Sequence, residues 1–149
     1  TIMLDGSTSA CALVPFLADF ENLIVITSSA KTSFILGEMG INNICTGGHM
    51  INKSLSYVGY DAERTAANYN ADVMFFSCRG ISSEGWITDN SIEENNLRQI
   101  MMKQSKKKIL LCDSSKFNKT CLHNLCHAEE LDDIISNVKI PDNLVNKLH

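Results

Sequence analysis

The sequence has no apolar run that would cross a membrane. No stretch approaches the roughly 20 consecutive apolar residues of a spanning helix, although 44% of the 149 residues are hydrophobic. The N-terminus also lacks the basic segment and apolar stretch of a secretory signal peptide. It begins inside a stretch that is typical of a β-strand, which indicates a piece of a longer protein. No membrane partner is expected.

Positive charge is scarce. Thirteen Lys and Arg residues stand against seventeen Asp and Glu residues, so the formal net charge is −4. A domain of this charge is a poor candidate for binding DNA by itself. The short basic run Lys106–Lys108 is placed at the end of a predicted helix, where cations complement the helix dipole. The length suits one domain with a sizeable core.

The six cysteines indicate neither disulfides nor zinc. Four of them lie within or beside apolar runs, namely Cys11, Cys45, Cys78 and Cys112. A free thiol packs there as a small hydrophobe. The cluster Cys121, His123, Cys126 and His127 has the spacing C-x-H-x-x-C-H. This is not a standard zinc pairing, and no second ligand pair stands at finger spacing. We expect a reduced, cytoplasmic protein with no metal and no cofactor.

Apolar runs alternate with helix-length segments along the chain. Strands are predicted at Ile2–Leu4, Leu23–Thr27, Asn43–Thr46, Val73–Ser77 and Ile109–Cys112, because these runs are short and almost continuously apolar. Helices are predicted at Ser9–Phe20, Lys31–Met39, Ser56–Asn68, Ile92–Lys106 and Ala128–Ser136. The alternation predicts an α/β domain with a mostly parallel sheet and helices on both faces.

Glycine and polar residues follow each predicted strand, at the ends where open parallel sheets bind ligands. These segments are Asp5–Thr8, Thr27–Ser29, Gly47–Gly48, Arg79–Gly80 and Asp113–Lys116. Loops are commonly polar and rich in glycine, which accounts well for the third segment. Two hydroxyl clusters and a lysine could in addition hold a phosphate and orient a polyol.

The run Asp5-Gly6-Ser7-Thr8-Ser9 is the most informative of these segments. It stands between a predicted strand and a predicted helix, where several backbone N–H groups lack partners and lie beside hydroxyls. Such an arrangement suits an anionic ligand, phosphate above all. An ordinary helix N-cap is the alternative, because Ser and Thr favour that position in any helix.

The strand-end motifs occur in a specific order. One part is Leu4–Thr8, Thr27–Ser29, Gly47–Gly48 and Gly59, and the other is Asp72–Phe76, Gly80–Ile81, Gly85–Thr88 and Asp113–Phe117. The set resembles the C-terminal effector-binding domain of DeoR-type bacterial transcriptional regulators, from Ile2 to about Leu144. This resemblance implies a three-layer α/β fold similar to ribose-5-phosphate isomerase and CoA transferases. It also implies a repressor of a sugar-utilisation operon whose effector is a phosphorylated sugar.

Carried over by position, the resemblance implies a set of ligand-binding residues. Gly6, Ser7 and Thr8 would cradle the phosphate, and Lys116 would add a positive charge. The full expected set is Asp5, Gly6, Ser7, Thr8, Thr27, Ser28, Ser29, Gly47, Gly48, Asp113 and Lys116, with Gly80, Glu94 and Arg98 as possible additions. Plain alternatives exist: Asp5 fixing the loops, Asp113 in an Asx-turn, Lys116 as a surface charge, and Arg98 paired with Glu94.

The expected organisation follows from the resemblance. Residues 1–149 would form one effector-binding domain, and the N-terminal winged helix-turn-helix of the family is absent from this chain. The chain would therefore sense a phosphorylated sugar, bind operator DNA only through that missing domain, and assemble as a homo-oligomer.

A sugar-phosphate isomerase on the same fold is the main alternative. That reaction needs a positioned base, usually a carboxylate, and a group that stabilises the enediolate. The fourth predicted strand ends in Phe76–Gly80 without a carboxylate, and a rough alignment places Arg98 where the isomerase base falls. We therefore expect binding without catalysis. A purely structural oligomerisation domain is a third hypothesis, which the donor-rich strand ends disfavour.

Overall fold

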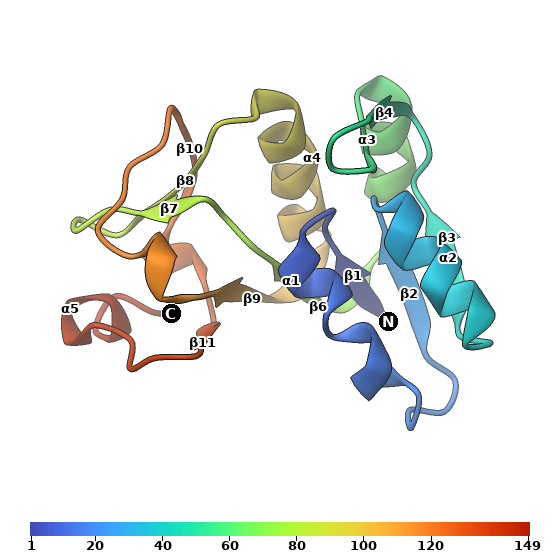
Figure 1. The fold of residues 1–149 in the computed structure, drawn as a ribbon, viewed down its shortest axis with the longest axis horizontal. Helices are drawn as coiled ribbons and strands as arrows, with labels where there is room; N and C mark the ends of the chain where they lie inside the picture. The colour runs from blue at the N-terminus through green and yellow to red at the C-terminus, as the bar shows by residue number, and fades with distance from the viewer.

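A six-stranded parallel sheet forms the centre of the computed structural model, which describes residues 1–149 (Figure 1). Its strands lie in the order β11 (Asp133–Ser136), β9 (Ser105–Cys112), β6 (Ala71–Phe76), β1 (Ile2–Leu4), β2 (Ile24–Thr27) and β3 (Asn42–Cys45). All five predicted strands are present in this sheet. None of the helices has the length and apolarity needed to cross a bilayer.

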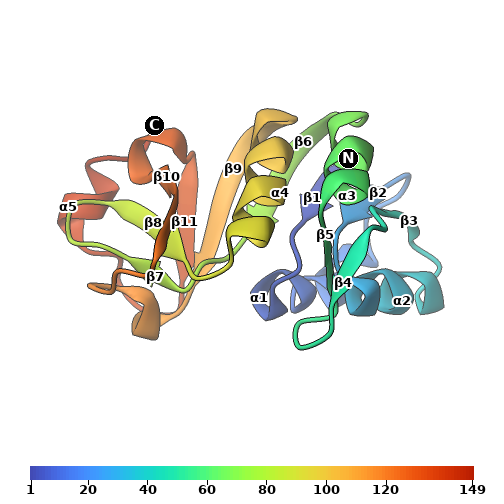
Figure 2. The same ribbon diagram turned by 90° about the horizontal axis from the view of Figure 1, so that it is seen from above.

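Helices cover both faces of this sheet, so the expected three-layer arrangement is confirmed (Figure 2). On one face, Met3, Met74 and Phe76 pack in a core with residues of α3 (Tyr60–Ala67) and α4 (Ile92–Lys103). On the other face, Leu4 and Val25 pack with α1 (Thr8–Cys11), the 3-10 helix η1 (Val14–Leu17) and α2 (Ala30–Glu38). Neighbouring residues such as Met3 and Leu4 serve opposite cores because side chains alternate along a strand.

Two further sheets were not predicted. One is antiparallel and consists of β7 (Gly80–Ile81), β8 (Trp86–Asp89) and β10 (His123–His127). The other is a hairpin of β4 (His49–Ile51) and β5 (Ser56–Val58). Short elements complete the fold: the 3-10 helices η2 (Ser114–Lys116) and η3 (Ala128–Glu130), and the helix α5 (Asp142–Val145).

Several predicted helices differ from the structure. The helix at Ser9–Phe20 is broken into α1 and η1, because Pro15 has no N–H to continue the α-helical bonding. The helix at Ser56–Asn68 starts only after β5, since Gly59 turns the chain at a φ of 87°. The helix at Ala128–Ser136 is wrong, because its second half is β11, which pairs with β9. Lys106–Lys108 lies in β9 and not at a helix end, and Lys106 Nζ is 2.8 Å from Asp72 Oδ1.

The order of the strands places a ligand crevice beside β1. From β1 the chain proceeds through β2 to β3 on one side, then returns to β6 on the other side and continues to β9 and β11. The boundary between β1 and β6 is therefore the topological switch point, where open α/β sheets bind ligands beyond the carboxyl ends of the strands. Asp5 and Ser77 follow β1 and β6 at that point.

Candidate functional site

A cavity of about 450 Å³ opens at the carboxyl ends of β1, β6 and β9. Its walls come from the loop after β1, the first turn of α2, the tip of the β4–β5 hairpin, the ends of β6 and β8, α4 and the loop after β9. Five cationic and three acidic residues line it, although the whole chain carries a net charge of −4. The cavity is thus a positively charged region of an acidic domain.

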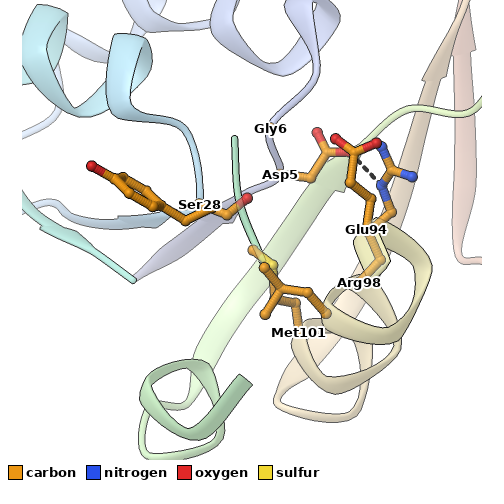
Figure 3. Close-up of a pocket in the computed structure, with 8 residues that line it drawn as sticks. Asp5, Gly6, Ser28, Glu94, Arg98 and Met101 are labelled. Carbon is orange, nitrogen blue, oxygen red and sulfur yellow. Dashed lines mark hydrogen bonds and ion pairs between the residues drawn. The ribbon is translucent and has the colours of Figure 1, made fainter. Parts of the chain in front are cut away.

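Seven of the predicted site residues line this cavity: Gly6, Ser7, Thr8, Glu94, Arg98, Asp113 and Lys116. Asp5 and Ser28 line a much smaller adjoining pocket together with Gly6, Glu94 and Arg98 (Figure 3). Ser29 lines a neighbouring groove of about 290 Å³. The other four residues, Thr27, Gly47, Gly48 and Gly80, line none of these spaces.

Asp5 holds the loop after β1 in place. It is 1% exposed, and its Oδ1 accepts hydrogen bonds from the amide of Ser7 at 3.1 Å and from the Ser7 hydroxyl. Its Oδ2 accepts from the amide of Ser77 at 3.3 Å and from Arg98 Nε at 2.8 Å. Both oxygens are therefore occupied within the protein, which favours loop fixing over sugar binding for Asp5.

The same loop keeps a set of free donors. The Ser7 hydroxyl accepts from the Ala10 amide at 3.1 Å, so Ser7 is an N-cap with both of its own donors committed to Asp5. In contrast, the amides of Gly6, Thr8 and Ser9 have no acceptor in the protein. Thr8 is exposed and lines the cavity. The donors available to an anion are therefore those around Thr8, with Ser7 supporting them.

Arg98 is the most deeply placed cation of the cavity. It is 6% exposed, and its Nη1 donates to Asp89 Oδ2 at 3.2 Å while its Nε binds Asp5 (Figure 3). Burial opposes its charge, yet the attraction of Asp5, Asp89 and Glu94 outweighs it, so the pKa of Arg98 lies above its ordinary value. Arg98 thus forms ion pairs with Asp5 and Asp89, and not the pair with Glu94 that was the alternative prediction.

Four charged residues of the cavity were missed as site residues: Lys31, Lys53, Arg79 and Asp89. Asp89 ends β8 and, besides binding Arg98, lies 3.7 Å from Arg79 Nε. Lys53 stands at the tip of the β4–β5 hairpin. Asp89 belongs to a strand, and Lys53 to a hairpin turn, that were not predicted, so the sequence did not indicate that these residues lie at the cavity. Arg79 was noted as a strand-end residue, and its position directly after β6 was the available signal.

The remaining predicted residues have structural partners. Thr27 Oγ1 accepts from the Ser29 amide at 3.1 Å, and Ser29 Oγ caps α2 by accepting from the Thr32 amide at 3.1 Å. Asp113 accepts from the amide and hydroxyl of Ser115, and these bonds lower its pKa below the ordinary range. The Asx-turn alternative for Asp113 is thus present, while Asp113 and Lys116 both still line the cavity.

The glycines Gly48 and Gly80 are explained by packing. Gly48 has a φ of 116°, and a Cβ there would lie 2.7 Å from the Val58 carbonyl oxygen. Gly80 is buried in β7, where a Cβ would lie 3.0 Å from Thr88 Oγ1. These close approaches within the protein account for both glycines, and the geometry gives no support to a ligand contact at either.

Three residues of the Cys/His cluster lie in β10, and Cys121 lies two residues before it. His127 Nε2 lies 2.9 Å from the Glu84 carbonyl oxygen, and its ring packs edge-on against Trp86. Cys126 is buried, and burial raises the pKa of its thiol. The structure contains no group of three or more His, Cys, Asp or Glu residues arranged to hold a metal ion.

Replacing Thr8 by valine is expected to weaken binding of phosphorylated ligands without changing the fold. The substitution preserves shape but removes a hydroxyl that makes no hydrogen bond within the protein. Charge-assisted hydrogen bonds typically contribute ~1.5–3 kcal/mol, so the dissociation constant should rise roughly tenfold or more. Calorimetric titration of the variant and the parent measures this, and equal affinities would show that Thr8 only begins a helix.

Sequence comparison identifies the family of the chain. The sequence model described as "DeoR C terminal sensor domain" matches residues 1–138. The chain belongs to this family. It is 33% identical over 148 residues to the HTH-type transcriptional regulator GolR of Listeria innocua, covering 99% of this chain and 58% of that protein. It is 31% identical over 136 residues to the L-fucose operon activator of Escherichia coli K12, covering 91% and 56%.

A third relative of the DeoR-type domain is the putative aga operon transcriptional repressor of Escherichia coli O157:H7. It is 28% identical over 141 residues, which are 94% of this chain and 52% of that protein. The chain thus spans a little over half the length of these relatives. The expected family is confirmed, and its named relatives are transcriptional regulators, among them both a repressor and an activator.

Two solved structures share the fold of this DeoR-type domain. Ribose-5-phosphate isomerase A of Methanocaldococcus jannaschii aligns with a TM-score of 0.52 over 78% of this chain and 45% of that chain. The delta subunit of eIF2B from Chaetomium thermophilum aligns with a TM-score of 0.62 over 93% and 50%. Sequence identity is 14% in both cases, so the likeness shows the fold alone.

Proposed function

We propose that this DeoR-type sensor domain binds a phosphorylated sugar in the cavity beside β1 and does not convert it. The observation that carries the proposal is the set of unpaired amides around Thr8, which face a cavity also lined by lysines and arginines. The cationic residues of the lining exceed the acidic ones by two. A phosphate monoester carries roughly −1.5 to −2 charges near neutral pH, which this excess balances.

Two of the three carboxylates that line the cavity are committed to partners within the protein and are unavailable as the base of an isomerase. Isomerisation of a sugar phosphate needs a free carboxylate to move a proton beside the carbonyl. Asp89 is committed to Arg98 and to the amides of Asn90 and Ser91, and Asp113 is committed to Ser115. Burial also raises the pKa of the Cys78 thiol to about 12, so this group stays protonated near neutral pH. Glu94 alone among the lining carboxylates has no hydrogen-bond partner.

Sugar phosphates are expected to raise the melting temperature of the domain and to be recovered unchanged. A ligand at 100 times its dissociation constant stabilises the folded state by about 2.7 kcal/mol. A panel of pentose and hexose phosphates, with the unphosphorylated sugars as controls, tests this by thermal shift and NMR product analysis. Product formation that disappears in Glu94→Gln would establish the isomerase instead. The absence of any shift across the panel would favour a purely structural domain.

We further propose that ligand occupancy changes the affinity of the full-length regulator for operator DNA. A ligand can do this only by binding one arrangement of the protein better than another. Because the named relatives include a repressor and an activator, either sign of response fits the family. Operator binding by the full-length protein with and without the best-binding sugar phosphate measures this coupling.

A further inference from the structure

The β4–β5 hairpin forms one wall of the cavity. It is a separate two-stranded sheet, and its turn contributes Lys53, Ser54 and Leu55 to the lining. The turn is closed by hydrogen bonds from the amides of Ser54 and Leu55 to the Ile51 carbonyl, at 3.2 and 2.8 Å. Leu55 has a φ of 54°, an uncommon conformation for a bulky residue.

The start of β5 and the turn residue before it are fastened to the loops after β1 and β2. The Tyr57 amide donates to the Ser28 carbonyl at 2.7 Å, and the Ala30 amide donates to the Leu55 carbonyl at 2.9 Å. Ser56 Oγ donates to the Gly6 carbonyl at 3.3 Å. The hairpin therefore takes its position from the same loop that presents the free amides around Thr8, and its tip stands over the cavity that they line.

Lys53 is an exposed cation without an ion pair at this tip. Lys107 and Lys119 are also exposed and have no ion pair, but unlike Lys53 they do not line the cavity. An ammonium group is a compact charge on a flexible stem, well suited to reach a phosphate. Ser54 adds a hydroxyl to the same wall.

We propose that Lys53 is an effector-binding residue and that the hairpin holds the anionic group of the ligand together with the Thr8 loop. This inference rests on the proposed function of the cavity and adds a binding residue from a separate element of the fold. Binding then joins the hairpin tip to the Thr8 loop through the ligand. The amides of the hairpin should consequently exchange more slowly with solvent when an anion is bound.

The test uses inorganic phosphate as the probe, titrated at constant ionic strength against sodium chloride. Lys53→Met is expected to raise the dissociation constant for phosphate roughly tenfold, as loss of a charge-assisted contact does. Lys53→Arg should keep the affinity within about threefold, because it preserves the charge. Lys139→Met is the matched control, since it removes an exposed lysine that does not line the cavity. Its affinity should equal that of the parent.

The outcomes separate this inference from the proposed function. Unchanged affinity in Lys53→Met, with weakened affinity in Thr8→Val, overturns the role of the hairpin and leaves the proposed function standing. Equal weakening in Lys53→Met and Lys139→Met also overturns it, because the effect would then be the net charge of the domain. If the parent protein binds neither phosphate nor any sugar phosphate above the chloride control, the proposed function itself fails.

Discussion

Replacing Arg98 by methionine is expected to lower the free energy of unfolding by about 3–5 kcal/mol, the usual effect of breaking a buried ion pair from one side. Asp5 and Asp89 are 1% and 3% exposed, and the substitution leaves both carboxylates buried without their cation. Urea unfolding followed by circular dichroism measures the loss. Because Asp5 also holds the Thr8 loop, phosphate binding should weaken in the same variant.

Two further variants make this prediction specific. Arg64→Met removes an exposed arginine that stacks 5.9 Å from the ring centre of Tyr60, and it should change stability by about 1 kcal/mol or less. Adding Asp5→Asn to Arg98→Met removes one of the stranded charges, so the double variant should lose less than the sum of the single losses. A loss in Arg98→Met no larger than that in Arg64→Met would show that the ion pairs contribute little.

Replacing Gly6 by alanine is expected to destabilise the domain by about 1–3 kcal/mol, as overpacking of a tight site does. A Cβ on Gly6 would lie 2.7 Å from the Cβ of Ser56, which is 1% exposed and has little room to move. The hairpin would have to shift away from the loop after β1. Phosphate affinity should therefore decrease together with stability, and both are measured on the same preparation by urea unfolding and calorimetry.

The control for this substitution is Gly37→Ala. Gly37 lies in α2, and a Cβ there would meet no atom within 4 Å. Alanine favours a helix over glycine by about 1 kcal/mol, so Gly37→Ala should leave the domain equally stable or slightly more stable. Reducing the side chain opposite Gly6, by adding Ser56→Gly to Gly6→Ala, should recover part of the loss. Parent-like stability in Gly6→Ala alone would contradict the close packing described for the hairpin.

Strands β1, β2 and β6 of the parallel sheet were predictable because each is a short, largely apolar run whose side chains pack on both faces of the sheet. Met3 and Met74 are fully buried, and their neighbours in the sequence are apolar as well. The antiparallel sheet of β7, β8 and β10 has no apolar run of this kind, since β8 contains Thr88 and Asp89. Thr88 is buried because its hydroxyl donates to the Gly80 carbonyl at 3.1 Å, a partner supplied by another strand. Pairing of this kind depends on the tertiary fold and not on a local pattern.

In the candidate site too, features set by adjacent residues were predictable and features set by distant residues were not. The loop from Asp5 to Ser9 was found because a strand, a glycine and a hydroxyl-rich helix start are adjacent in the sequence. The partner of Asp5 was not found, since Arg98 lies 93 positions further along the chain. Arg98 was predicted as a possible ligand-binding residue, with a pair to Glu94 as the alternative. The helix at Ala128–Ser136 failed for a similar reason. Ile134 and Ile135 favour a strand because they pair with β9, and no local sequence pattern indicates that pairing.

The construction of the β4–β5 hairpin has a consequence for how sensors of this kind diversify. Residues 52–55 at its tip are all exposed, and two of the three bonds that fasten the hairpin to the loops after β1 and β2 come from its backbone. Side chains at the tip can therefore be exchanged without disturbing either core or the aspartates that hold Arg98. With the proposed role of Lys53, recognition of a particular effector is separate from the part of the domain that must remain constant to fold. The hairpin tip is accordingly the natural place to redirect such a domain toward a new anionic metabolite, by selection in cells or by design in the laboratory.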